Sequence, residues 1–102
     1  MNTITIRGEY VVRSEFSAFD VPYLVIENID EYKGEAPCIV VNSLHPDYSL
    51  LLGSIRLVVA ENGSALSHLA TIAREYDVAV FLSREKIMTK IPQRGTLTLT
   101  EC

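Results

Sequence analysis

The sequence predicts an α/β domain with strands of mixed direction, and three observations support this prediction. Short β-branched, aliphatic and aromatic runs recur along the chain, separated by polar or turn residues. One segment, residues 67–76, instead repeats its apolar residues every three or four positions, as an amphipathic helix does. With 102 residues, 48% of them hydrophobic and 22% charged, the chain has the size and apolar content of one domain spanning residues 1–102.

The first part of the chain is expected to form strands. These are predicted at Ile4–Ile6, Tyr10–Val12, Val21–Ile26 and Cys38–Val41. The last is a continuous apolar run, typical of a strand buried on both faces, so it should lie centrally in the sheet. A thiol in such a run, that of Cys38, is expected to be buried and reduced, and neither Cys38 nor Cys102 has the spacing of a redox or disulfide motif.

Residues 42–53 are predicted to contain one or two helical turns. Pro46 suits the first helical position, and Gly53 suits a residue just past the end. The apolar run Ile55–Ala60 then predicts another strand. It should stop at the turn cluster Glu61–Ser64.

The segment Ser67–Tyr76 predicts the amphipathic helix. Its apolar stripe consists of Leu66, Leu69, Ala70, Ala73 and Tyr76. His68, Thr71 and Glu75 fall on another face, so the helix should present His68 outward. Ser64 or Ser67 can serve as the N-cap, which places His68 in or beside the first helical turn.

The remaining residues predict two more strands and a short connection. Val78–Leu82 is an apolar strand, and Ser83–Met88 resembles a short polar helix. Gly95 should then make a turn, after which Thr96–Thr100 alternates as the final strand. A strand would thus lead through a tight loop into the helix that carries His68.

Charge and composition argue against several classes of function. A formal charge of -4 and scattered basic residues disfavour nucleic-acid binding. The sequence shows no signal peptide and no apolar run of membrane-spanning length, so we expect a cytoplasmic protein. His45 precedes a proline and is expected to be a loop residue. Two histidines without an acidic or thiol cluster do not predict a metal site.

His68 is the candidate catalytic residue. Neutral imidazole is a nucleophile near pH 7, and the phosphoramidate that it forms can pass its phosphoryl group onward. At a helix N-terminus, unpaired backbone N–H groups attract a phosphate. The hydroxyls of Ser64, Ser67 and Thr71 could donate further hydrogen bonds to it.

The sequence from Glu61 to Glu75 resembles the phosphohistidine signature of the mobile domain of phosphoenolpyruvate-utilising enzymes, such as phosphoenolpyruvate synthase and pyruvate phosphate dikinase. That signature reads acidic-x-Gly-Gly-x-x-Ser-His-x-Ala-x-x-Ala-Arg-Glu. The matching positions are Gly63, Ser67, His68, Ala70, Ala73, Arg74 and Glu75. The chain departs from the family at Ser64, where a second glycine is usual, at Leu66, often Thr, and at Asp77, usually Gly. Similarity is looser over the rest of the second half, and the first 35 or so residues match poorly.

The resemblance implies a swivelling β/β/α phosphohistidine domain, with a mixed or barrel-like sheet packed with helices. It implies that His68 accepts a phosphoryl group from a nucleotide-binding partner and passes it to a pyruvate, phosphoenolpyruvate or other acceptor site. Gly63, Ser64, Ser67, Thr71 and Arg74 are the candidate phosphate-binding residues. ATP and Mg²⁺ are expected on a nucleotide-grasp kinase domain or protein, because this chain contains no Gly-rich Walker loop.

Two other interpretations remain open at the level of sequence. The substituted loop and the unmatched N-terminal third also fit a non-catalytic binding or regulatory module that retains the fold. Arg74 and Glu75 could be ordinary surface charges at a helix end. The chain could act independently or be a domain of a longer enzyme, and oligomers could form through open strand edges.

Overall fold

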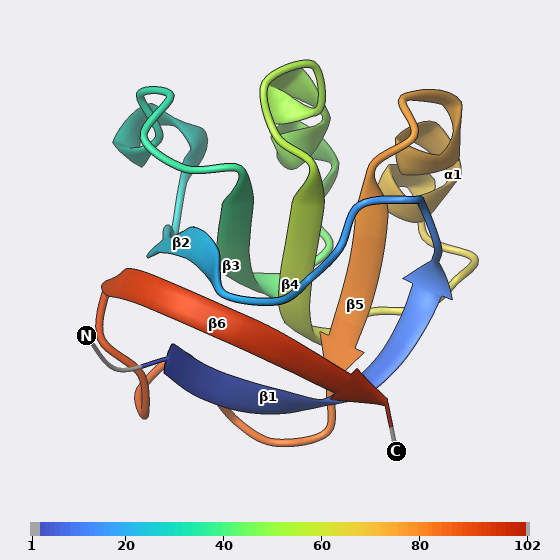
Figure 1. Cartoon of the computed structure of the whole chain (residues 1–102). Coiled ribbons are helices and arrows are strands. Elements are labelled where there is room, and N and C mark those ends of the chain that lie inside the picture. Colours follow the sequence, from blue (N-terminus) through green and yellow to red (C-terminus); the bar gives the residue numbers. More distant parts are fainter. Residues whose placement is uncertain (1–2, 102) are drawn as a thin grey trace.

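The computed structural model describes residues 3–101, in which six strands close into a barrel (Figure 1). The strands are β1 (Thr3–Val12), β2 (Val21–Val25), β3 (Cys38–Ser43), β4 (Leu57–Asn62), β5 (Ala79–Ser83) and β6 (Arg94–Glu101). One α-helix, α1 (His68–Glu75), and two 3-10 helices, η1 (Ile29–Glu31) and η2 (Pro46–Leu51), complete the fold. Within residues 3–101, every helix is too short or too polar to span a bilayer.

The barrel combines parallel and antiparallel pairs, as the prediction of a mixed or barrel-like sheet required. Its strand order is β1-β5-β4-β3-β2-β6. The pairs β2/β3, β3/β4 and β4/β5 are parallel, and so is β6/β1, which closes the ring. The pairs β1/β5 and β2/β6 are antiparallel. β1 and β6 run side by side across the front of the view in Figure 1.

The central strands bury both faces, which explains their continuous apolar sequences. In β3, Cys38 and Val40 point into a core shared by residues of all six strands, which fills the barrel. Ile39 and Val41 point the other way, into a second core that includes residues of η2 and α1. The predicted burial of Cys38 is therefore confirmed, whereas Cys102 lies outside the described residues.

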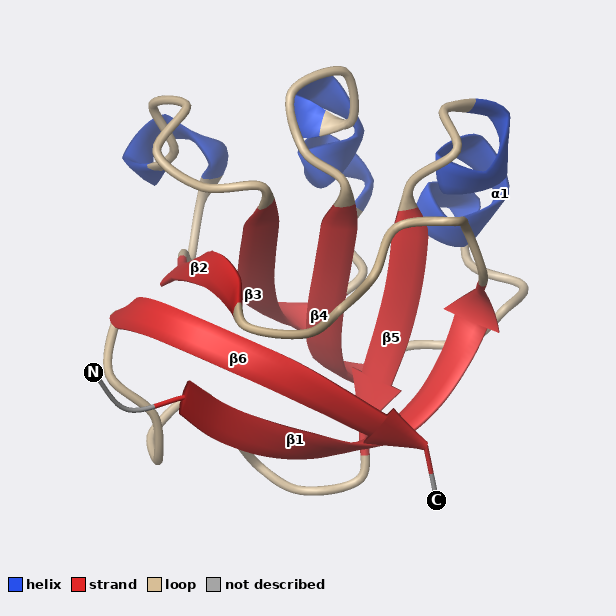
Figure 2. Ribbon diagram, in the orientation of Figure 1, coloured by secondary structure: helices blue, strands red, loops and turns tan. Residues whose placement is uncertain are grey.

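The three helices lie in a row over one face of the sheet, as Figure 2 shows. Each connects two neighbouring parallel strands: η1 joins β2 to β3, η2 joins β3 to β4, and α1 joins β4 to β5. A connection between parallel strands must return against the strand direction, so each helix begins toward the edge where strands end. His68, the first residue of α1, thus belongs to the carboxyl edge of the sheet.

Several predicted elements have different limits in the structure. Ile4–Ile6 and Tyr10–Val12 form one strand, β1, whose register with β5 shifts between Tyr10 and Val12. The strand predicted at Ile55–Ala60 begins at Leu57 and extends to Asn62, so Glu61 and Asn62 belong to β4 rather than to a turn. η1 was not predicted at all. Asn28 and Glu31 build it through a capping box.

Three predictions near the C-terminal half are wrong. Ser83–Met88 is not a helix, because Ser83 ends β5 and its hydroxyl pairs with the backbone of Glu85 in a turn. Gly95 does not form a turn. It lies inside β6 and packs against the ring of Tyr23. The apolar stripe of the helix is shorter than predicted, since Leu66 and Tyr76 are exposed.

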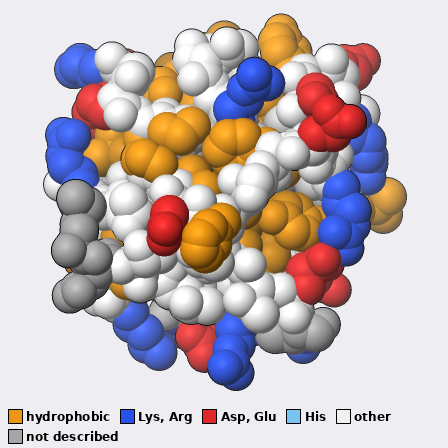
Figure 3. All heavy atoms as spheres, in the orientation of Figure 1, with side chains coloured by type: hydrophobic (Ala, Val, Ile, Leu, Met, Phe, Trp, Pro, Cys, Tyr) orange, Lys and Arg blue, Asp and Glu red, His pale blue; other side chains and the backbone are white. Residues whose placement is uncertain are grey.

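Closure of the barrel bears on self-association. Each of the six strands pairs with two neighbours along at least part of its length, so no strand within residues 3–101 is an edge strand. The edge strands that we expected as a route to oligomers are therefore absent from residues 3–101. On the face in Figure 3, acidic and basic side chains are dispersed around apolar ones, and neither sign gathers into one patch.

Candidate functional site

The candidate site is built around His68, the first residue of α1. Ser67 is the N-cap of this helix, with extended backbone angles, and its Oγ accepts a hydrogen bond of 3.1 Å from the N–H of Ala70. This confirms the predicted helix start and selects Ser67 over Ser64 as the cap. The imidazole therefore sits at the N-terminal end of the helix, where the dipole is positive.

The packing of α1 leaves the imidazole accessible. Leu69, Ala70 and Ala73 are fully buried in the second core, between the helices and the sheet, and fix the helix on the sheet. His68 lies on the exposed side. A phosphoryl donor can therefore reach the ring without displacing any core residue.

Backbone N–H groups are available beside His68. The N–H of Ala70 is capped by Ser67, and that of Thr71 donates to the Ser67 carbonyl at 3.1 Å. The N–H groups of His68 and Leu69 have no acceptor among residues 3–101. The first turn of α1, which begins at His68, also contains no Asp or Glu. An anion at this helix start would meet unpaired donors and no repelling carboxylate.

Ser64 and Ser67 shape the loop before the helix. The Oγ of Ser64 accepts from the N–H of Leu66 at 3.2 Å, and its carbonyl accepts from the N–H of Ser67 at 3.1 Å. Both serine hydroxyls thus act as acceptors toward the backbone and keep their own protons to donate. Thr71 differs, because its hydroxyl donates to the Ser67 carbonyl at 3.2 Å.

Gly63 enters this loop with a backbone conformation that suits glycine. Its φ of +148° lies in a region that residues with a side chain rarely adopt. A Cβ on Gly63 would also lie 2.6 Å from Cδ1 of Leu44. The first glycine of the motif is therefore required by the geometry of the loop, whereas its usual second glycine is replaced by Ser64 without strain at that position.

Arg74 lies apart from the other candidate phosphate ligands. It occupies the last turn of α1, six residues after His68 and about 9 Å farther along the helix axis. Its Nη2 donates to the carbonyl of Val11 in β1 at 3.4 Å. Asp77 follows the helix with a φ of 58°, the left-handed conformation that the family's usual glycine would adopt.

Glu61 is a residue of the site that the sequence reasoning missed. Its Oε2 accepts from the N–H groups of Ile87 and Met88, at 2.6 and 2.5 Å. The carboxylate thereby ties the segment after β5 to the end of β4, from which the His68 loop departs. The acidic position of the family motif falls on Glu61 and could have identified it as a site residue. No local pattern indicated that its carboxylate would bind the N–H groups of Ile87 and Met88.

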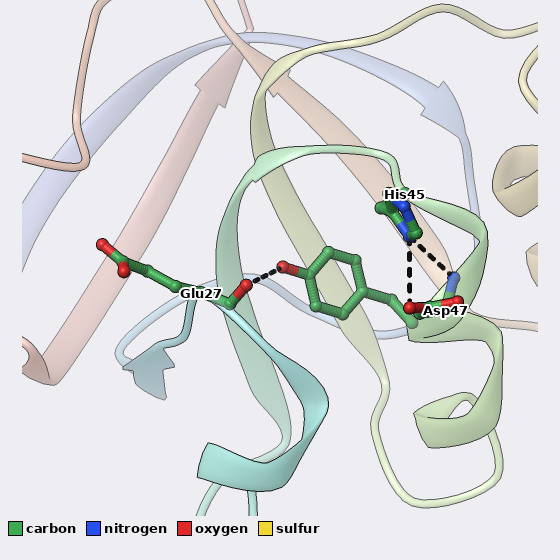
Figure 4. A network of polar contacts seen from close by, with 4 residues as sticks. Glu27, His45 and Asp47 are labelled. Carbon is green, nitrogen blue, oxygen red and sulfur yellow. Dashed lines mark hydrogen bonds and ion pairs between the residues drawn. The ribbon is translucent and has the colours of Figure 1, made fainter.

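A separate hollow lies between η1 and η2. Its volume is about 520 Å³, and it is lined by Glu27, Asn28, Ile29, Asp30, Asn42, Ser43, His45, Asp47, Tyr48 and Met88. Figure 4 shows Nδ1 of His45 accepting from the N–H of Asp47, while a tyrosine, Tyr48, donates to the carbonyl of Glu27. His45 is the N-cap of η2, a loop role as expected. His68 does not line this hollow, and within residues 3–101 no group of three acidic, thiol or imidazole side chains is placed to hold a metal ion.

A model of a known protein family matches most of the chain. The family model described as the mobile domain of PEP-utilising enzymes matches residues 34–100. A search of curated proteins found no significant match. The matched segment contains β3, the loop of Gly63, the whole of α1 and nearly all of β6.

Proposed function

Since the chain belongs to the family of the mobile domain of PEP-utilising enzymes, we propose that it is a cytoplasmic phosphocarrier domain with His68 as the phosphoryl acceptor. The observation that carries this proposal is the position of His68, exposed at the capped start of a helix whose other side is buried. A surface histidine alone would support no such role. Its place in the family motif and at an anion-binding helix end supports it.

The chemistry requires little from this chain beyond a free imidazole. The lone pair of one ring nitrogen forms an N–P bond while the P–O bond to the donor breaks, and the donor oxygen keeps that electron pair. The ring then releases the proton of its other nitrogen to solvent. In the second transfer an acceptor oxygen attacks phosphorus, the N–P electron pair returns to the ring, and the ring takes up a proton again.

The groups around His68 would hold the phosphoryl oxygens. The N–H groups of His68 and Leu69 and the hydroxyl protons of Ser64 and Ser67 are the donors nearest in the chain. We assign the hydroxyl of Thr71 a weaker role because its proton is engaged by the helix. Arg74 would bind phosphate only after a change of side-chain conformation, so we assign it first to the contact with β1.

Partners would supply the remaining functions. A phosphohistidine brings negative charge to a helix start whose first turn contains no Lys or Arg. We therefore infer that cations of the partner sites, including Mg²⁺ with ATP on a nucleotide-grasp kinase domain, balance that charge. A swivel of this domain between the donor and a pyruvate- or phosphoenolpyruvate-type acceptor would carry the group from one to the other.

The direct test is phosphorylation of the whole chain. The protein is incubated with a nucleotide-grasp kinase from the same organism and ATP, with phosphoenolpyruvate and an acceptor-site protein, or with phosphoramidate, a small chemical phosphodonor. Intact mass should increase by one phosphoryl group that is labile in acid, and His68→Asn should abolish the increase. His45→Asn, which alters the other histidine, should retain it. Failure of every donor to modify the wild-type chain would refute the proposal.

The second candidate function is a non-catalytic binding or regulatory module. Ser64 and Leu66, which replace residues usual in the family motif, are the observation that favours it. This function predicts that His68→Asn leaves partner binding and the cellular phenotype unchanged. A loss of phenotype in His68→Asn with retained partner binding would support the phosphocarrier instead.

A further inference from the structure

We propose that Leu66 is a docking residue for the protein that donates the phosphoryl group to His68, and that this donor holds an apolar recess beside its phosphate site. This inference rests on the proposed function and adds a specificity-determining contact to it. Leu66 is 92% exposed, whereas the other exposed large hydrophobic residues are less so: Phe19 68%, Leu50 73% and Tyr76 54%.

The exposure of Leu66 is built into the loop. Its N–H donates to Oγ of Ser64, and the next residue, Ser67, is held by the carbonyl of Ser64 and caps α1. Leu66 itself and Ser67 after it are thus held to Ser64 by hydrogen bonds. The side chain is presented to solvent by a structured turn.

Geometry places Leu66 inside any contact made with His68. Two residues separate their Cα atoms by at most about 7 Å. Phosphoryl transfer requires the reacting atoms to approach to about 3–3.5 Å. A protein that brings a phosphorus atom to the imidazole therefore comes close enough to the backbone of Leu66 to contact its exposed side chain.

The character of the surface indicates which partner it fits. Ser64, Ala65, Leu66 and Ser67 carry no charge, and no carboxylate lies in the first turn of α1. Leu66 is the large apolar group of this uncharged surface. The donor meets the unmodified chain, in which that surface is complete, whereas the acceptor meets a chain whose phosphohistidine dominates the same surface. We therefore assign Leu66 to the donor.

The test uses a neutral substitution, Leu66→Asn, so that no added charge repels the phosphate. Its matched control is Leu50→Asn, which alters another exposed leucine at the far end of η2, where that helix approaches the opposite edge of the sheet. Two phosphodonors are compared: the nucleotide-grasp kinase with ATP, and phosphoramidate, which requires no docking. The readout is the second-order rate of His68 phosphorylation by intact mass.

Leu66→Asn should lower the kinase-dependent rate by about tenfold to a hundredfold, the factor expected for losing burial of one leucine side chain. It should leave the phosphoramidate rate unchanged, and Leu66→Met should restore the kinase-dependent rate. Leu50→Asn should affect neither. An unchanged kinase-dependent rate in Leu66→Asn, an equal fall with both donors, or a fall confined to delivery to the acceptor would each overturn the inference. If no donor modifies the wild-type chain, the proposed function fails and this inference fails with it.

Discussion

Gly63 lies directly against Leu44, so that a Cβ added to the glycine would come within 2.6 Å of a leucine methyl carbon. This contact joins the loop that leads to His68 with the segment that follows β3. The same glycine has a φ of +148°. Space and backbone conformation both demand the absence of a side chain at this point.

Gly63→Ala should therefore destabilise the protein by about 1–3 kcal/mol, the range for a residue forced into a sparsely populated conformation. Urea denaturation measures the free energy of unfolding. Gly53→Ala is the matched control, because Gly53 has ordinary φ and a methyl group there would meet nothing within 4 Å, and it should change stability by less than about 1 kcal/mol. Adding Leu44→Ala to Gly63→Ala would remove the clash with the leucine side chain but not the strain of the backbone conformation at residue 63. Equal stability of Gly63→Ala and Gly53→Ala would contradict the loop conformation.

Glu61→Ala should loosen the segment after β5. Two backbone donors, the N–H groups of Ile87 and Met88, would lose a charged acceptor, which costs about 1.5–3 kcal/mol for a hydrogen bond to a charged group. Hydrogen exchange of those two amides should accelerate more than exchange in β3. Glu85→Ala, which removes an exposed carboxylate nearby, should leave both amides protected. Unchanged protection in Glu61→Ala would show that the carboxylate does not hold this segment.

The ion pair between Arg13 and Glu101 predicts a pH dependence. The hydrogen bond from Arg13 holds the pKa of Glu101 below its ordinary value of 4.5. Because the pKa is lower in the folded state, Glu101 contributes stability above pH 4.5, and this contribution disappears as the pH falls through the lowered pKa. Titration of the side-chain carboxyl by NMR should show the pKa returning toward 4.5 in Arg13→Gln.

Glu35 provides the comparison for that titration. Its pKa is lowered first by the backbone N–H of Lys33, next by its own backbone N–H, and only after these by Arg94. Arg94→Gln should therefore move the pKa of Glu35 less than Arg13→Gln moves that of Glu101. Equal shifts in the two variants would contradict the assignment of Arg13 as the principal cause.

The thiol of Cys38 should be unreactive in the folded protein. Complete burial raises its pKa far above the ordinary value, so almost no thiolate exists at about pH 8. In a Cys102→Ser background, which leaves one thiol to measure, DTNB should react only as fast as the barrel opens. Rapid reaction under native conditions would contradict the described packing of β3.

Sequence reasoning succeeded where a segment determines its own structure. β3 and the start of α1 are predictable because a doubly buried strand is continuously apolar and because Ser67 can cap a helix. His68 could likewise be placed at the exposed helix start, because the apolar positions of α1 fix its orientation.

Predictions failed where distant residues decide the structure. Residues 83–88 have a helix-like pattern, but Glu61 in β4 engages the N–H groups of Ile87 and Met88 and favours an open turn. The spacing of Leu66 from Leu69 fits the helix stripe, yet the helix begins after Ser67 and the loop turns Leu66 outward. Closure of the barrel depends on pairing β1 with β6, which no local pattern reveals.

The ring of strands also constrains the order of events in folding. β6 lies between β1 and β2 in the barrel. β1 and β6, which are far apart in the sequence, must therefore pair before the barrel closes. A ribosome would have to release residues 94–101 before the structure could form, and until then the apolar interior would be open to water and chaperones. Proteins dominated by such distant pairings fold in milliseconds to seconds rather than microseconds. We expect residues 3–101 to fold cooperatively, only after β6 has been synthesised.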